Sequence, residues 1–157
     1  MVVKYNTLVM NKKTIAYFAL TLLMSMTAYA QQFNPESNFR IARIDNGRAV
    51  SITGYTGNST AVNIPPQIQG LPVTAIGDRA FIRANITNVT IPNSVTSIGG
   101  SAFSDTTRLT SVTFGGNGIA IGWEAFPGNL VIVYAAGGAG AYTRDPDGTM
   151  WTRRQGQ

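Results

Sequence analysis

The sequence contains neither cysteine nor histidine among its 157 residues. The missing cysteine excludes a disulfide framework, a thiolate nucleophile, a thiolate metal site and an N-terminal lipoprotein cysteine. The missing histidine removes the commonest general base near neutral pH and the commonest metal ligand. Carboxylates are the remaining groups for acid–base chemistry, so the range of enzymes that this chain can represent is narrow.

Charged residues are few, and the positive excess is concentrated near the N-terminus. The chain has 12 Lys+Arg against 7 Asp+Glu, a net charge of +5. All three lysines (Lys4, Lys12 and Lys13) precede residue 31 and no acid does, which leaves nine arginines, seven acids and a net charge of +2 for the remainder. These arginines are scattered, whereas nucleic-acid binding depends on clustered phosphate contacts. We therefore expect no nucleic-acid partner.

Residues 1–30 have the features of a Sec-type signal peptide. A short basic stretch at Asn11–Lys13 precedes an apolar run at Ile15–Met26, and an Ala-Tyr-Ala tripeptide at 28–30 offers the small-x-small cleavage pattern. The apolar run is shorter than the roughly 20 residues that span a bilayer, so a transmembrane anchor is the less favoured alternative. Translation starts at Met1 or at Met10, the latter giving a compact signal. We expect a secreted, periplasmic or cell-surface protein whose mature chain has no membrane span.

The pattern Ile-Gly-x-x-Ala-Phe occurs three times, at 76–81, 98–103 and 121–126, with spacings of 22 and 23 residues. A second apolar pattern keeps the same step, because Ile-x-x-Val-x-Ile at 86–91 is followed by Leu-x-x-Val-x-Phe at 109–114. Self-similarity at a fixed period is the signature of a solenoid in which each repeat forms one coil and stacked coils bury a common core.

The repeat predicts buried rows that run from coil to coil. The phenylalanines would form an aromatic ladder beside a row of isoleucines, and burying each such side chain contributes about 1.5–3 kcal/mol. The glycines of the motif would occupy backbone positions that require a positive φ or a close approach between coils. The predicted ladder residues are Ile76, Gly77, Phe81, Ile98, Gly99, Phe103, Ile121, Gly122 and Phe126.

These motifs resemble the leucine-rich repeats of BspA-like bacterial surface proteins. The resemblance rests on the stretches 91–103 and 109–114, and it extends from an opening repeat at 52–77 to a closing segment at 138–152. It implies a mainly β leucine-rich-repeat solenoid of about three to four coils of 22–23 residues, with short parallel strands. The first repeat carries five extra residues at Gln67–Leu71, and the third has Gly118 where Val73 and Val95 stand. The resemblance also implies an adhesive or host-interaction function for this chain. Because the array is short and two of its repeats are modified, the fold transfers from the family to this chain better than that function does.

Terminal coils of a solenoid need covers, and the flanking sequences supply hairpin signals. Asp45-Asn46-Gly47 between two apolar runs predicts a hairpin whose Phe39, Ile41, Ile44, Val50 and Ile52 cover the first coil. At the other end, Leu130–Tyr134 is expected to form the last strand, and a turn at 145–148 is expected to bring Tyr142, Met150 and Trp151 over the final coil. The expected organisation is a tail and capping hairpin at 31–58, a solenoid at 59–134 and a C-terminal cap and tail at 135–157.

Motifs for cofactors, metals and catalysis are weak. The glycine-rich stretches 116–118 and 137–140 lack the Lys-Ser/Thr ending and the context of a phosphate-binding loop. Asp145 and Asp147 fall short of the six to eight oxygen ligands that calcium takes, so a plain turn is favoured. We expect no cofactor, no metal and no enzyme activity. A hydrolase would have to draw on the seven carboxylates of the mature chain: Glu36, Asp45, Asp78, Asp105, Glu124, Asp145 and Asp147.

The remaining candidate for a functional site is a binding surface on the concave face of the repeat strands. On these strands, outward positions alternate with buried ones. Its residues are small, uncharged and able to form hydrogen bonds, which suits a protein or glycan ligand, host extracellular matrix included. Arg79, Arg83, Arg108 and Trp123 on the turns form an alternative patch. A periplasmic structural or assembly module and a carboxylate-based glycan hydrolase remain alternative functions. The predicted binding face comprises Asn63, Asn88, Thr90, Ser111, Thr113 and Tyr134.

Overall fold

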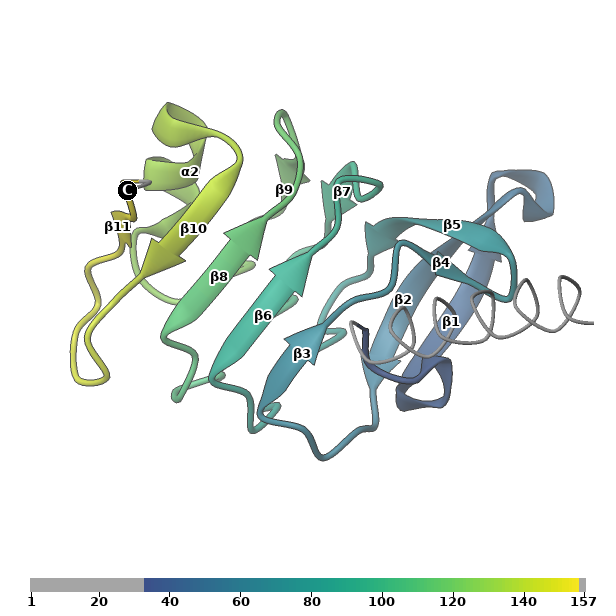
Figure 1. Ribbon diagram of the computed structural model, residues 1–157, viewed down its shortest axis with the longest axis horizontal. Coiled ribbons are helices and arrows are strands. Elements are labelled where there is room, and N and C mark those ends of the chain that lie inside the picture. Colours follow the sequence, from purple (N-terminus) through teal and green to yellow (C-terminus); the bar gives the residue numbers. More distant parts are fainter. Residues whose placement is uncertain (1–32, 156–157) are drawn as a thin grey trace, which may run out of the picture. The chain divides into compact units, whose positions relative to one another are not determined.

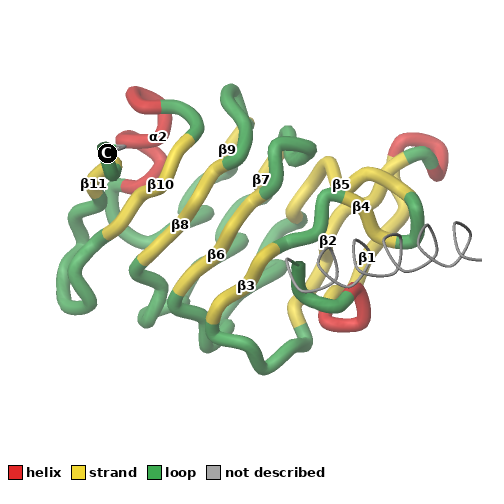
Figure 2. The backbone as a smooth tube through the Cα atoms, in the orientation of Figure 1, coloured by secondary structure: helices red, strands yellow, loops and turns green. Residues whose placement is uncertain are grey.

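The structure is a computed structural model that describes residues 33–155, and the predicted signal peptide lies outside these residues. The described chain winds into successive coils, each of which contributes one strand to each of two sheets (Figure 1). Figure 2 shows the strands as rungs that are joined by loops, with little helix. The expectation of a mainly β solenoid with short parallel strands is therefore confirmed.

The first sheet has the order β11-β10-β8-β6-β3. Strands β3 (Ala61–Asn63), β6 (Asn88–Ile91) and β8 (Ser111–Phe114) are parallel and in register. Strand β10 (Gly140–Thr143) then adds antiparallel to β8, and β11 (Thr152–Arg153) adds antiparallel to β10. The repeat therefore builds three strands of this sheet, and the C-terminal segment builds two.

The second sheet has the order β1-β2-β5-β7-β9. Its strands are β1 (Phe39–Ile44), β2 (Ala49–Tyr55), β5 (Leu71–Ile76), β7 (Ser97–Ile98) and β9 (Ala120–Ile121). All neighbours are parallel except β1 and β2, which form a hairpin. The five-residue insertion of the first repeat forms β4 (Gln67–Ile68) and the turn that pairs it antiparallel with β5. Two 3₁₀ turns, at Glu36–Asn38 and Asp45–Gly47, flank β1.

The three repeat phenylalanines stack through the middle of the coils. The ring centroids of Phe81 and Phe103 are 4.7 Å apart, those of Phe103 and Phe126 are 4.6 Å apart, and the rings are nearly parallel. Tyr55 continues the stack at the N-terminal end, with its ring 5.4 Å from that of Phe81. Because Tyr55 lies outside the repeat, the sequence pattern did not reveal this fourth rung.

The repeat glycines sit where adjacent coils approach each other. A Cβ atom on Gly99 would lie 2.5 Å from the backbone nitrogen of Asp78, and one on Gly122 would lie 2.6 Å from that of Gly100. Neither glycine has a positive φ. Close approach between coils, the second of the two predicted reasons, therefore explains these glycines.

The left-handed backbone positions occur elsewhere in the same turns. Arg79, Ser101 and Glu124, two residues after each repeat glycine, have φ values of 55°, 53° and 50°. A left-handed residue reverses the chain direction, at a cost of about 1–2 kcal/mol for a residue other than glycine. The chain therefore turns at Arg79, Ser101 and Glu124, two residues after the glycines at which adjacent coils make contact.

The N-terminal cap matches the prediction in its hairpin and differs in its tail. Strands β1 and β2 pair as predicted, and β2 continues the second sheet through a parallel pairing of Ile52 with Ile76. Residues 33–38 are not a loose tail. Asn34 and Asn63 exchange hydrogen bonds of 2.9 and 2.6 Å, and the Glu36 carboxylate accepts the Gln69 N–H at 3.0 Å.

The prediction of a last strand at Leu130–Tyr134 is wrong, because this segment lies in the helix α2 (Leu130–Gly137). Strand β10 occupies the place beside β8, so the apolar run has no strand partner and satisfies its backbone internally. Leu130 and Tyr134, four residues apart on one helix face, are buried. The Tyr134 hydroxyl donates a hydrogen bond to the Gly116 carbonyl at 2.9 Å and accepts the Ile119 N–H at 3.1 Å.

The C-terminal cap uses two of its three predicted residues. Tyr142 and Trp151 are fully buried, and the Trp151 indole N–H donates to the Pro127 carbonyl at 2.8 Å. Met150 does not cover the last coil, since 68% of its surface is exposed. Met150 and Trp151 both precede β11, and only Trp151 is inserted into the core. Arg153 and Arg154 lie in the segment expected as a cap and tail, and they are held by β11 and by a hydrogen bond from the Arg154 N–H to the Ala141 carbonyl.

Arg144 ties this cap to the last coil, and its loss is expected to destabilise the protein by about 2 kcal/mol. Its guanidinium donates to the carbonyls of Leu109 at 2.7 Å, Thr107 at 3.0 Å and Gly148 at 2.5 Å, and it lies 5.5 Å from the centre of the Trp151 ring. Urea unfolding of Arg144→Met measures the change. The exposed Arg154→Met variant is the control, and an equal loss in both variants would contradict this role.

Alkaline pH is expected to weaken the fold through two tyrosines. Burial raises the pKa of the Tyr55 and Tyr142 phenols above the ordinary value of about 10. The unfolded chain then ionises first, so the stabilisation is complete below about pH 10 and is lost as the pH rises through the folded pKa values. Urea midpoints at about pH 8 and pH 11 test this expectation. Tyr55→Phe removes one of the two groups and should flatten the decline, and an unchanged decline would exclude Tyr55 as a source.

Candidate functional site

The outward positions of the first sheet form two rows across its strands. The strand registers place the first row on Ala61, Asn88, Ser111, Thr143 and Thr152. The second row consists of Asn63, Thr90, Thr113 and Ala141. We call these two rows together the polar face. Neighbouring strands lie about 4.8 Å apart, so side chains in one row are within contact distance of each other.

The side chains of the polar face are small and uncharged. Asn63 and Asn88 are exposed, whereas Thr90, Ser111 and Thr113 are half-buried within the sheet surface. The carboxamide oxygen of Asn88 accepts a hydrogen bond from the Thr87 hydroxyl at 2.7 Å. Among residues 33–155, the hydroxyls of Thr90, Ser111 and Thr113 have no protein partner. These hydroxyls can therefore donate to and accept from a ligand.

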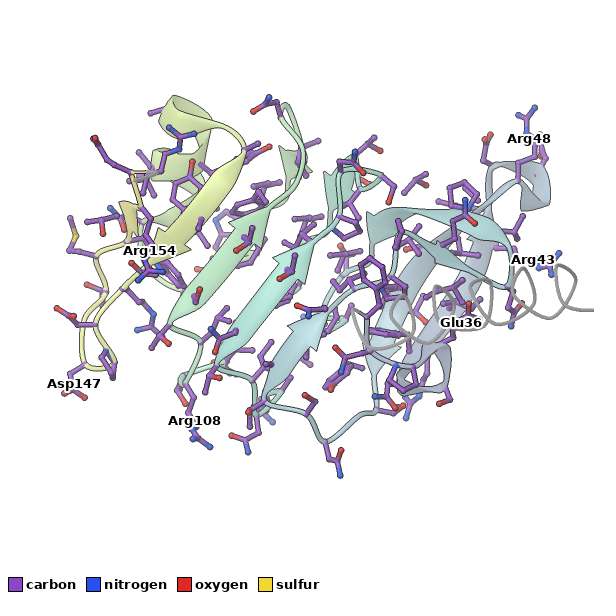
Figure 3. All side chains as sticks on the ribbon, in the orientation of Figure 1. Glu36, Arg43, Arg48, Arg108, Asp147 and Arg154 are labelled. Carbon is purple, nitrogen blue, oxygen red and sulfur yellow. The ribbon has the colours of Figure 1, made fainter. Side chains whose placement is uncertain are left out.

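Charged side chains lie around the polar face. In Figure 3, Arg108 and Asp147 project from loops at the ends of the strands. Arg108 donates a hydrogen bond to the Asn85 side chain at 2.9 Å, and Arg83 forms a 3.4 Å ion pair with Asp105. Two arginines of the alternative patch are therefore engaged with neighbouring turns, and the polar face itself carries only neutral side chains.

The structure changes the membership of the predicted face at its C-terminal side. Tyr134 does not belong to it, because this residue is buried in α2 with its hydroxyl bonded to the backbone. Thr143 and Thr152 extend the first row instead. Sequence reasoning missed them because β10 and β11 carry no repeat motif. The alternating run Gly140–Thr143, followed by the turn at 145–148, was the available signal.

The carboxylates mainly have structural partners. The Asp78 carboxylate accepts the Gly100 N–H of the next coil at 2.8 Å, and the Glu36 carboxylate accepts the Gln69 N–H. Asp45 forms an ion pair with Arg48 at 3.1 Å. Asp105 and Glu124 line one groove, but both are exposed, Asp105 to 56% of its side chain. Residues 33–155 contain no group of three or more acids that could hold a metal ion. No helix in the described part of the chain is long and apolar enough to cross a membrane.

The repeats match a known sequence family. A model described as the BspA type leucine-rich repeat region, in six copies, matches residues 58–134. A leucine-rich repeat protein from Bacteroides capillosus is 31% identical, with a TM-score of 0.55, and the match covers 62% of this chain and 75% of that protein. The chain belongs to the BspA-type leucine-rich repeat family. The predicted family membership is therefore confirmed.

Two further solved leucine-rich repeat proteins are similar in sequence and fold. One, from T. pallidum, is 33% identical, with a TM-score of 0.50 over 51% of this chain. The other, a leucine-rich cell surface protein from Faecalibacterium prausnitzii, is 33% identical, with a TM-score of 0.53 over 60% of this chain. The BspA-type chain spans only 38% and 27% of these two relatives. A comparison with curated proteins finds no match.

Proposed function

We propose that this BspA-type protein is an exported, non-catalytic binding module that recognises a protein or glycan through its polar face. The supporting observation is the pair of in-register rows whose Thr90, Ser111 and Thr113 hydroxyls have no partner among the described residues. Neutral hydroxyls on a rigid sheet suit a ligand that offers many hydrogen-bonding groups, such as a glycan or a peptide backbone. The leucine-rich repeat fold supports protein interaction as the general role.

Export and surface exposure form the second part of the proposal. The signal-peptide features of residues 1–30 and the similarity to a bacterial cell surface protein support it. Protease shaving of whole cells tests it, with detection of this chain before and after treatment. Digestion at the cell surface is expected. Retention in the cytoplasm would contradict export, and a periplasmic location by fractionation would favour the structural or assembly role.

A bulky charge on the polar face is expected to abolish ligand binding without unfolding the protein. Thr90→Glu places a carboxylate at the centre of the second row, where it displaces hydrogen-bonded contacts and introduces an uncompensated charge. Pull-downs against extracellular-matrix proteins and glycan arrays should give binding for the unmodified protein and at least a tenfold loss for the variant, about 1.4 kcal/mol.

The control for this variant is Thr149→Glu, which adds the same charge at an exposed position outside the sheet. It should bind like the unmodified protein. Equal loss in both variants would indicate a general charge effect, and full binding by Thr90→Glu would remove the polar face from the proposal. Circular dichroism confirms that each variant remains folded.

A further inference from the structure

The two sheets end differently at the C-terminal side of the coils. The first sheet continues beyond the last repeat strand into β10 and β11, whereas the second sheet stops at β9 (Figure 1). No strand among residues 33–155 pairs with the outer edge of β9. An unpaired strand edge is a template for the addition of another extended chain.

The unpaired groups continue a regular series between coils. The Gly99 N–H donates to the Ile76 carbonyl at 2.7 Å, and the Gly122 N–H donates to the Ile98 carbonyl at 2.8 Å. In the third coil the equivalent Ile121 carbonyl receives no hydrogen bond from the described chain. An N–H from an additional strand would complete this series.

Two backbone N–H groups in the following turn also lack the partner that their equivalents in the previous coil have. The Ser101 N–H donates to the Trp123 carbonyl at 2.9 Å, and the Phe103 N–H donates to the Ala125 carbonyl at 2.7 Å. The corresponding N–H groups of Glu124 and Phe126 have no partner in the described residues. Strand β9 therefore presents an unpaired acceptor for an added strand, and its turn presents two further donors for the carbonyls of a bound polypeptide.

A groove of about 820 Å³ lies beside these backbone groups, between the turns of the last two coils and the start of α2. Trp123 and Ile132 line it and are 77% and 72% exposed, and Val131 adds further apolar surface. Exposed aromatic and aliphatic side chains around a concavity mark an interaction site rather than ordinary surface. Helix α2 contributes Val131 and Ile132 to one wall of the groove.

The charge of the groove restricts the occupant. Asp105 and Glu124 contribute carboxylates, and no lysine or arginine is among the lining residues. Asp105 is paired with Arg83, whereas Glu124 has no ion pair within the described chain. A lysine or arginine of an occupant would complement the unpaired Glu124 carboxylate.

We propose that this groove binds an extended polypeptide segment, which adds as a strand to β9, inserts apolar side chains beside Trp123 and Ile132 and places a lysine or arginine near Glu124. The site is separate from the polar face, and its occupant is a peptide segment of another protein. Main-chain hydrogen bonds supply affinity in this binding mode, and the side-chain contacts select the sequence.

Selection from a random peptide library displayed on phage tests the proposal, with the purified protein as bait and Ile132→Ser as the counter-selection. Enriched sequences should combine apolar residues with at least one lysine or arginine. The best synthetic peptide should bind about tenfold more weakly to Ile132→Ser, because an apolar contact is lost. Met150→Ser, equally exposed and outside the groove, should leave binding unchanged. Failure to enrich any peptide, or equal binding by Ile132→Ser, would overturn the proposal.

Amide hydrogen exchange identifies the binding mode. The Glu124 and Phe126 amides should exchange rapidly in the free protein and become protected when the peptide is added. Protection that is already present without peptide and disappears on dilution would identify a second copy as the occupant and overturn the peptide assignment. Peptide binding without protection of these amides would overturn strand addition, and binding of glycans alone at this groove would overturn the polypeptide class. Thr90→Glu should not change any of these results.

Discussion

Phe103→Ala is expected to lower the free energy of unfolding by about 3–5 kcal/mol, because the substitution removes a fully buried ring and leaves a cavity. Phe103 stacks on Phe81 at 4.7 Å and on Phe126 at 4.6 Å, so its loss removes contacts on both sides. In a solenoid the stability depends on interfaces between neighbouring coils, and this residue belongs to two of them. Since a domain of this size is stable by about 5–15 kcal/mol, the substitution removes between about a fifth and all of that stability.

Trp123→Ala provides the matched control for this prediction. It also removes a large aromatic ring, but 77% of Trp123 is exposed, so its stability should change by less than about 0.5 kcal/mol. Urea unfolding followed by far-ultraviolet circular dichroism measures both variants. A loss in Phe103→Ala no larger than that in Trp123→Ala would show that the coils are not held together by the ladder.

The repeat made the core predictable because the same buried position returns in each coil. Phe81, Phe103 and Phe126 could be assigned to one stack from their spacing alone, and alternation along the strands then located Thr90 and Thr113 on the outer surface. Each of these inferences concerns a position that the repeat presents at least twice, and the physical constraint on it is the same each time.

The ends were less predictable because their conformation depends on competition for one place in the sheet. The run Leu130–Tyr134 is apolar and β-branched, which is compatible with a strand or with a short buried helix. The edge of β8 is taken by β10, and the helix results. The loss of Tyr134 from the polar face, the gain of Thr143 and the groove beside α2 all follow from this one event. The run Gly140–Thr143 and its turn give a local signal for β10, but the competition between β10 and Leu130–Tyr134 for the edge of β8 is not a local property.

The two glycines at positions 99 and 100 allow close approach between coils to be distinguished from backbone freedom as the reason for a glycine. We expect substitution by alanine to have opposite effects on stability at the two positions. A Cβ atom at position 99 would lie 2.5 Å from the Asp78 backbone nitrogen, a contact that forces neighbouring coils apart. We expect Gly99→Ala to cost about 1–3 kcal/mol, the usual range for overpacking. A Cβ atom at position 100 would lie 3.5 Å from the Trp123 carbonyl oxygen, which is ordinary contact.

Gly100→Ala should therefore stabilise the protein by about 0.4–1 kcal/mol, because alanine reduces the conformational freedom of the unfolded chain and the φ of this residue is not positive. The Gly100 N–H remains available to the Asp78 carboxylate, which it meets at 2.8 Å, so the hydrogen bond between coils survives the substitution. Thermal unfolding of the two variants side by side measures the difference. Equal losses at both positions would mean that the motif requires glycine for backbone freedom, whereas opposite signs would show that Gly99 is required because two coils touch at this position.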